Sequence, residues 1–163
     1  MGRSVALADL GQRVEWVRSD FQGLSQTRTM PDDFDLVISS YALHHLNAQE
    51  KRAILTSVVQ SIKPGGWFLN ADIVVAEAPA VERRIQELRV AGVTARAPAD
   101  DERFGRLDVT RQFLDDLETA EQDQPQTVDE ELRILRESGI ANAEVFWKEY
   151  RETVIGGSKA NSR

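Results

Sequence analysis

The 163-residue sequence contains no cysteine, no long apolar run and no excess of basic residues. The lack of cysteine excludes disulfides, thiolate metal ligands and cysteine nucleophiles, and it is compatible with a reducing compartment. No apolar run approaches the length that crosses a bilayer, and the N-terminus lacks the apolar core of a secretory signal, so we expect a cytoplasmic protein with no membrane partner. The formal net charge of −7, from 20 basic and 27 acidic residues, leaves no broad basic surface, so no nucleic-acid partner is expected.

The length predicts one domain with a hydrophobic core, and 41% hydrophobic with 29% charged residues are typical of a globular protein. The acidic charge is concentrated in residues 100–131, which contain 12 Asp or Glu and three Arg and so carry −9, leaving +2 elsewhere. We interpret this segment as a solvated helical cap. A site for a cation or a basic partner is the alternative.

Residues 34–74 are the stretch around which the rest of the chain is organised. Two apolar runs, residues 34–40 and 67–74, are too short for ordinary helices and read as strands. Between them Asn47 and Glu50 have the spacing of a capping box, and Pro64 with its two glycines is expected to end the helix and reverse the chain. Because neither strand alternates with polar residues, we expect a parallel pair inside a sheet that helices cover on both faces.

The flanking segments supply further elements. Residues 4–10 indicate the end of a helix that stops at Gly11, residues 14–21 a strand, and residues 22–33 a loop. After the second apolar run, residues 79–92 and 109–117 have the spacing of amphipathic helices.

The C-terminal part predicts a helix and a hairpin. Thr127 and Glu130 form a second capping box, and Gly139 ends the helix that it begins. Residues 143–150 and 152–159 then read as two strands joined by a tight turn.

Several of these features, in this order, resemble one protein family. Residues 33–37 (Asp-Phe-Asp-Leu-Val), 43–46 (Leu-His-His-Leu) and 62–66 (Ile-Lys-Pro-Gly-Gly) resemble the fourth strand, following helix and fifth strand of class I S-adenosylmethionine-dependent methyltransferases. The resemblance implies an α/β, Rossmann-like methyltransferase fold, with a mostly parallel sheet and a C-terminal antiparallel hairpin. It implies a single partial methyltransferase domain over residues 1–163, with a helical lid insertion over residues 75–125.

The resemblance also implies residues that bind the cofactor, S-adenosylmethionine. Asp20 would accept a hydrogen bond from the adenine amino group, and Phe21 would offer an apolar face to the ring. A turn or cap role for Asp20 at a strand end is the alternative. Ser39, Ser40 and Tyr41 lie at the carboxyl end of a strand, where ligands bind in open parallel sheets, and are expected to line the edge of the cofactor.

His44 and His45 are the only histidines. The resemblance places His45 near the cofactor, and His44 is the candidate catalytic base that faces the acceptor; the alternative is that both pack at a polar helix start. Because adjacent residues on a helix point about 100° apart, we do not expect the pair to chelate one metal, and no metal is predicted. Asp72, at the end of the second strand, would either orient substrate or cap the following turn, and we favour the cap.

The sequence contains no Gly-x-Gly, although such a cofactor site normally has a glycine-rich turn after its first strand. The opening strand, helix and strand of the family, roughly 30 residues or more, have no counterpart, so we expect a domain truncated at its N-terminus, either naturally or through a misassigned start. Residues 14–18 would then be an orphan strand and residues 34–39 an exposed edge. The two could close on each other, the edge could form a homodimer, or the chain could be a shortened gene product.

Taken together, these features predict a methyltransferase for an unidentified small-molecule acceptor, with weak or no cofactor binding by this chain. A non-catalytic module that keeps the methyltransferase scaffold and pairs through the exposed edge is the alternative from another class. A nicotinamide-dependent reductase would have the same alternation of strands and helices, but the Leu-His-His-Leu and Lys-Pro-Gly-Gly motifs do not favour that class.

Overall fold

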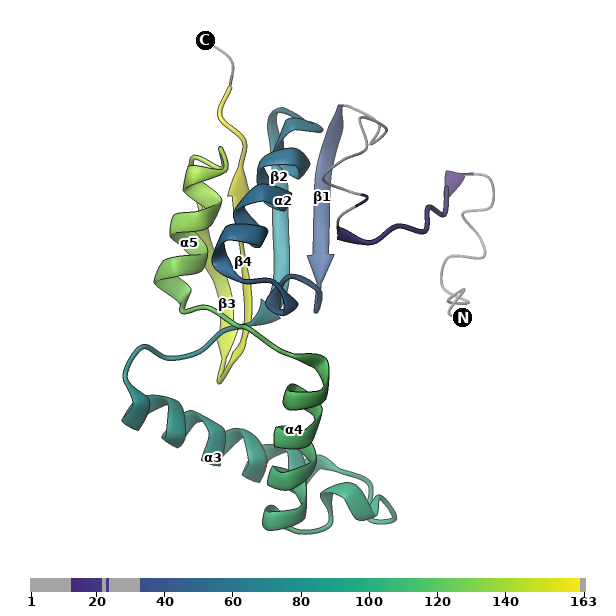
Figure 1. The fold of residues 1–163 in the computed structure, drawn as a ribbon, viewed down its shortest axis with the longest axis vertical. Helices are drawn as coiled ribbons and strands as arrows, with labels where there is room; N and C mark the ends of the chain where they lie inside the picture. Colours follow the sequence, from purple (N-terminus) through teal and green to yellow (C-terminus); the bar gives the residue numbers. More distant parts are fainter. Residues whose placement is uncertain (1–12, 22, 24–32, 162–163) are drawn as a thin grey trace.

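The computed structural model describes residues 13–21, 23 and 33–161 (Figure 1). In chain order its elements are strand β1 (Phe34–Ser40), the short 3-10 helix η2 (Leu43–His45), helix α2 (Ala48–Gln60), strand β2 (Ile62–Ile73), helix α3 (Pro79–Arg96), the 3-10 helix η3 (Glu102–Phe104), helices α4 (Leu107–Glu121) and α5 (Val128–Glu137), and strands β3 (Glu144–Glu149) and β4 (Glu152–Ser158). The helix end predicted at residues 4–11 and most of the loop predicted at 22–33 lie outside the described residues. Within the described ranges no helix is both long and apolar enough to span a bilayer.

The described residues contain one four-stranded sheet in the order β1-β2-β4-β3. Strands β1 and β2 are parallel, as predicted, and Ser39 pairs with Asn70 near their carboxyl ends. Strand β4 runs antiparallel to both β2 and β3, and the turn at Tyr150 and Arg151 makes the predicted hairpin. The prediction of a mostly parallel sheet is wrong for these residues, because the hairpin adds directly to β2 and only one of the three pairings is parallel.

Helix α2 begins with the predicted capping box. The Asn47 side chain accepts hydrogen bonds of 3.0 Å from the backbone N–H groups of Gln49 and Glu50, and the Glu50 carboxylate accepts one of 3.0 Å from the N–H of Asn47. These bonds satisfy amide donors that have no partner inside the helix.

The end of α2 differs from the prediction. The helix stops at Gln60 and β2 starts at Ile62, so the chain reverses direction before Pro64 and not at it. Gly65, with φ of 75°, lies instead in the irregular first part of β2, where the register with β1 shifts. This is the left-handed region that glycine occupies without a steric cost.

Helices α2 and α5 cover the same face of the sheet (Figure 1). Between this face and the two helices lies the main core, made of Leu43, Ile54, Leu55, Val58, Val59, Ile62, Phe68, Ile134, Leu135, Ile140, Ala143 and Ile155. Burial of these apolar side chains is the main stabilising contribution to the fold.

On the opposite face Leu36, Ile38 and Trp67 are 45%, 64% and 43% exposed. The predicted sheet with helices on both faces is therefore wrong for the described part of the chain. Strand β1 has apolar residues on both faces, which is the pattern of a strand covered on both sides. The pattern shows that a face is apolar, but it does not show whether a helix covers that face.

The strand predicted at residues 14–21 does not form. Residues 14–20 have no regular secondary structure, and none of the strand pairings in the described structure involves them. Trp16 and Val17 are largely exposed, and Phe21 packs against the core instead. The proposed closure of this segment on β1 is consequently wrong, since β1 pairs only with β2 among the described strands.

Helices α3 and α4 lie beyond the carboxyl ends of β1 and β2 (Figure 1). Helix α3 continues past Gly92, where the prediction ended it, to Arg96. Of the residues predicted to form its apolar face, Val81 and Leu88 are exposed and Ile85 is only half-buried. Helix α4 agrees with the amphipathic helix predicted at residues 109–117.

Helix α5 begins as predicted at Thr127, whose hydroxyl accepts a hydrogen bond of 3.3 Å from the N–H of Glu130. The second half of the capping box is absent, because the Glu130 carboxylate binds Arg133 instead. The helix ends next to Gly139, which has φ of 106°.

Candidate functional site

The carboxyl ends of β1 and β2 bring His44 and Asp72 together. His44 Nδ1 lies 2.5 Å from Asp72 Oδ1, and both side chains are 5% exposed. The other carboxylate oxygen accepts from the backbone N–H groups of Leu43 and His44, at 3.0 and 3.1 Å. Asp72 was predicted to cap the turn that follows it; its carboxylate instead caps the preceding η2 and also accepts a hydrogen bond of 2.9 Å from the N–H of Ile73.

The local backbone explains why His44 points at this carboxylate. Tyr41 ends β1 with φ of 45°, a conformation that costs energy for a residue with a side chain, and its N–H donates to the Ala71 carbonyl at 2.9 Å. This backbone conformation places η2 next to the end of β2. Asp72 therefore accepts hydrogen bonds from the η2 amides and contacts the His44 imidazole. A carboxylate on Nδ1 fixes the ring orientation and leaves Nε2 as the nitrogen available for chemistry.

Tyr41 borders this site. Its side chain is 57% exposed, and its ring meets His44 edge to face with centroids 6.4 Å apart. Partial burial and the negative charges of Glu152 and Asp72 raise the pKa of the Tyr41 hydroxyl, although Arg89 opposes them. The hydroxyl is accordingly a hydrogen-bond donor at neutral pH.

The segment after α4 packs against η2. Gln122 has φ of 57° and turns the chain, and the Gln124 N–H then donates to the His44 carbonyl at 2.7 Å. The Gln126 side chain donates to the Leu46 carbonyl at 3.3 Å. These bonds hold Asp123 against the two histidines, although it lies 78 or more positions away in the sequence.

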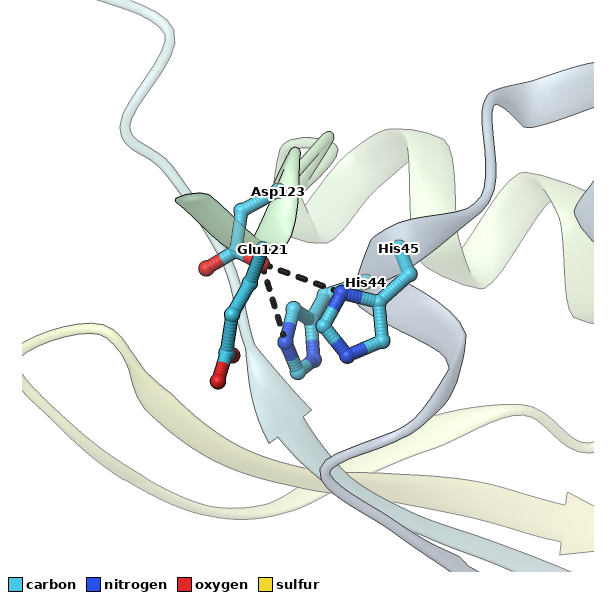
Figure 2. Close-up of side chains that lie close together, drawn as sticks. All are labelled: His44, His45, Glu121 and Asp123. Carbon is cyan, nitrogen blue, oxygen red and sulfur yellow. Dashed lines mark ion pairs between the residues drawn. The ribbon is translucent and has the colours of Figure 1, made fainter. Parts of the chain in front are cut away.

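Figure 2 shows the resulting cluster of His44, His45, Glu121 and Asp123. Asp123 Oδ1 lies 3.4 Å from His44 Nε2 and 3.1 Å from His45 Nδ1, and the Asp123 side chain is 8% exposed. The rings of the histidines are close, with centroids 4.0 Å apart. The two histidines present different ring nitrogens, Nε2 of His44 and Nδ1 of His45, to the same carboxylate oxygen.

An apolar cavity of about 340 Å³ lies beside β1. Phe21, Ser39 and Ser40 line it, together with apolar residues of β1, α2 and β2. Three of the residues predicted to bind the cofactor thus share one cavity, and Asp20, Tyr41 and His45 do not line it. The Asp20 carboxylate accepts a hydrogen bond of 2.6 Å from the N–H of Gly23, which matches the alternative role as a turn residue.

Sequence reasoning missed Glu121 and Asp123 as members of the site. Their only signal was the acidic excess of residues 100–131, for which a cation site was the less favoured alternative. No spacing in the sequence links them to the histidines, because the contact depends on where α4 ends in space.

Comparisons with known proteins agree with this architecture. Residues 3–66 match the family model described as "Methyltransferase domain". An uncharacterized methyltransferase of Geobacillus sp. (strain WCH70) is 33% identical over 90 residues, which cover 55% of this chain and 41% of the relative. The aligned part is thus less than half of that curated protein.

Solved structures support the same fold. An O-methyltransferase family protein from Burkholderia thailandensis superposes with a TM-score of 0.61 at 16% identity, covering 98% of this chain and 40% of that chain. The structure described as PigF with SAH superposes with a TM-score of 0.59 at 18% identity, covering 95% of this chain and 38% of that chain. With the parallel β1-β2 unit, these comparisons show that residues 3–66 match a methyltransferase domain and that the chain shares its fold with part of solved methyltransferases.

Proposed function

We propose that the chain carries the acceptor side of a methyltransferase that moves a methyl group from S-adenosylmethionine to a hydroxyl oxygen of a small molecule, with His44 as the base. The observation that carries the proposal is the buried His44–Asp72 pair at the carboxyl ends of two parallel strands. Ligands bind at this end of parallel sheets. The O-methyltransferase likeness named above supports oxygen as the methylated atom.

The proton balance fits this reaction. When a hydroxyl oxygen attacks the methyl group, the sulfur keeps the electron pair of the broken S–C bond, and the hydroxyl must lose its proton. His44 Nε2 takes this proton, while Asp72 on Nδ1 holds the ring and stabilises the imidazolium that forms. A base of this kind contributes roughly 10²–10⁴-fold to the rate.

S-adenosylmethionine supplies an electrophilic methyl group when bound. The residues fit it in part: Phe21 offers an apolar ring face, and Ser39 and Ser40 are small residues beside the cavity. Asp20 fits less well, because the Gly23 amide uses one of its carboxylate oxygens. Since the sequence contains no Gly-x-Gly, we expect this chain alone to bind the cofactor weakly, and calorimetric titration with a micromolar dissociation constant would contradict that expectation.

Helices α3 and α4 are the proposed lid over the acceptor, within the segment 75–125. They lie beyond the strand ends that carry His44 and Asp72, and Asp123 follows α4 directly (Figure 1). A lid in this position would exclude water from the reacting groups.

The test is a methyl-transfer assay with radiolabelled S-adenosylmethionine at millimolar concentration and a panel of phenols and alcohols. His44→Gln should lower kcat by about 10²-fold or more, with little change in KM. Asp72→Asn should also act mainly on kcat, because it misorients the base. Asp115→Asn, an exposed change on α4, is the matched control. Equal kcat for His44→Gln and the unmodified chain would refute the role of the base.

A second candidate function is pairing with another copy through the β1 edge, as a non-catalytic interaction module would do. It is favoured by the exposed Leu36 and Ile38 on a strand that has one unpaired side among the described strands. Sedimentation should then detect a dimer, and Ile38→Lys should shift it toward monomer. A folded protein that stays monomeric at high concentration would exclude this candidate.

A further inference from the structure

We propose that His44, His45 and Asp123 form a binding site for a divalent transition cation, with zinc as the best match, and that Glu121 supplies a fourth ligand. This site goes beyond the proposed function, because binding a cation requires neither a methyl donor nor an acceptor. The four side chains offer one ligand atom each, and these atoms lie within 4.8 Å of one another.

The first argument comes from polar atoms without a partner. His45 Nδ1 and Asp123 Oδ1 are buried and lie 3.1 Å apart, yet neither has a hydrogen-bond partner, so the angles between them do not suit a hydrogen bond. The Asp123 side chain is more than nine-tenths buried, so its carboxylate loses much hydration free energy, and no hydrogen bond to Oδ1 replaces the lost water. A cation placed between the histidines and Asp123 would satisfy both atoms.

The second argument comes from distances. Zinc binds imidazole nitrogen and carboxylate oxygen at about 2.0–2.2 Å with tetrahedral geometry, which sets neighbouring ligand atoms about 3.3–3.5 Å apart. The distances from Asp123 Oδ1 to the histidine nitrogens, 3.4 and 3.1 Å, are close to this edge length. Small side-chain rotations suffice to admit the ion, and exposed Glu121 is free to adjust its rotamer.

The third argument comes from the second nitrogen of His44. Histidine ligands usually donate their other ring N–H to a carboxylate, which fixes the tautomer and strengthens the ligand nitrogen. The 2.5 Å contact of His44 Nδ1 with Asp72 has this geometry and directs Nε2 toward Asp123.

The choice of metal follows from the ligands. Two imidazoles with carboxylates favour zinc and neighbouring transition ions, whereas magnesium and calcium prefer sites made of oxygen alone. A bound ion would occupy the Nε2 electron pair that methyl transfer needs, so zinc should inhibit the transfer. This last consequence rests on the proposed function, but the site itself does not.

The test is calorimetric titration of the full chain with zinc chloride, after removal of metals with a chelator and in a buffer that does not bind zinc. We expect one zinc ion per chain. Asp123→Asn and His45→Gln should each weaken binding at least about 10-fold, and Asp72→Asn by about 10–100-fold. Asp115→Asn, with its exposed carboxylate on α4, should bind like the unmodified chain.

Lack of saturable binding with one ion per chain, or equal affinity for Asp123→Asn, would overturn the site. If a variant does not fold, as judged by circular dichroism, the unmodified chain still gives an answer: zinc chloride should raise its Tm, and magnesium chloride should not. An equal rise with both salts would contradict imidazole ligation. Zinc binding without any methyl transfer would leave the site standing and count only against the proposed function.

Discussion

Arg151 Nη1 lies 2.6 Å from Glu118 Oε1, so a buried guanidinium in the hairpin turn holds a carboxylate of α4. Arg151 also donates to the Val74 carbonyl at 3.2 Å, and its Nε lies 3.3 Å from Glu82 on α3. Arg89 adds a second guanidinium 2.7 Å from Glu118. This network joins the helical pair α3–α4 to the sheet.

Replacing Arg151 with Met should destabilise the protein by roughly 2–3 kcal/mol. The expected cost is below the about 3–5 kcal/mol of a fully broken buried pair, because Arg89 remains beside Glu118. Urea unfolding at neutral pH measures the change. Arg84→Met on the exposed surface of α3 is the control and should change stability by less than about 0.5 kcal/mol.

The same network predicts a loss of stability in acid. Burial alone would raise the pKa of Glu118, but the hydrogen bonds and charges of Arg151 and Arg89 outweigh it, and the pKa of Glu118 lies below its usual value. A lowered pKa in the folded state gives stability that is present above the unfolded-state pKa of about 4.3 and is lost as pH falls through the folded-state value.

Urea midpoints measured between pH 7 and pH 3 should therefore fall below about pH 4, and the fall should be smaller in Glu118→Gln. A variant that loses stability as steeply as the unmodified chain would show that other groups dominate the acid response.

Lys51 on α2 and Glu131 on α5 form an ion pair in which both side chains are almost completely buried. Lys51→Met should cost about 3–5 kcal/mol because it leaves a buried carboxylate without its cation. Burial already raises the pKa of Glu131 more than Lys51 lowers it, so the lone carboxyl should take up a proton in the variant. A raised pKa in the folded state makes the penalty smaller as pH falls, and unfolding at pH 5 and pH 8 should show this difference.

The double variant Lys51→Met with Glu131→Leu is the matched control. Apolar replacement of both partners should recover most of the lost stability. A double variant as unstable as the single one would mean that packing, and not the unpaired charge, sets the cost.

The α2 cap gives a smaller and more local prediction. Asn47→Ala removes the acceptor for the Gln49 and Glu50 amides and should cost about 1 kcal/mol, whereas Asn47→Asp should be nearly neutral. Thermal unfolding followed by the helical signal in circular dichroism measures the difference. Equal stabilities for the Ala and Asp variants would mean that the cap contributes nothing.

Gly156 on β4 faces the backbone of β2 so closely that an added Cβ would lie 2.1 Å from the Phe68 carbonyl oxygen. Gly156→Ala should therefore disturb the β2–β4 pairing and cost at least about 1–3 kcal/mol, as for other overpacked sites. Gly105→Ala is the control, because its added Cβ would come no closer than 3.9 Å to a neighbouring atom. Unfolding curves in urea compare the two, and similar midpoints would argue against the tight strand contact.

Local signals in the sequence predicted local structure well. The capping box at Asn47, the helix start at Thr127 and the terminal hairpin depend on residues a few positions apart, and the structure has all three. The parallel pairing of β1 and β2 could also be predicted, because a single strand-helix-strand unit specifies it.

The contacts that build the candidate site could be predicted only in part. His44 and Asp72 were each named as candidates, but their pairing depends on the positive φ of Tyr41, and nothing in the sequence predicts that conformation. Asp123 and the Lys51–Glu131 pair join residues about 80 positions apart. The strand predicted at residues 14–21 failed for a similar reason, since its apolar residues specify no partner strand.

Gln122, the residue that follows α4, has a left-handed backbone conformation with φ of 57°. Its left-handed conformation is the point at which the chain leaves the helix and delivers Asp123 to the two histidines. Asparagine or glycine would adopt this conformation readily, and a β-branched residue would resist it. A β-branched substitution at this one position would therefore move Asp123 away from His44 and His45, although residue 122 is itself not one of the proposed ligands.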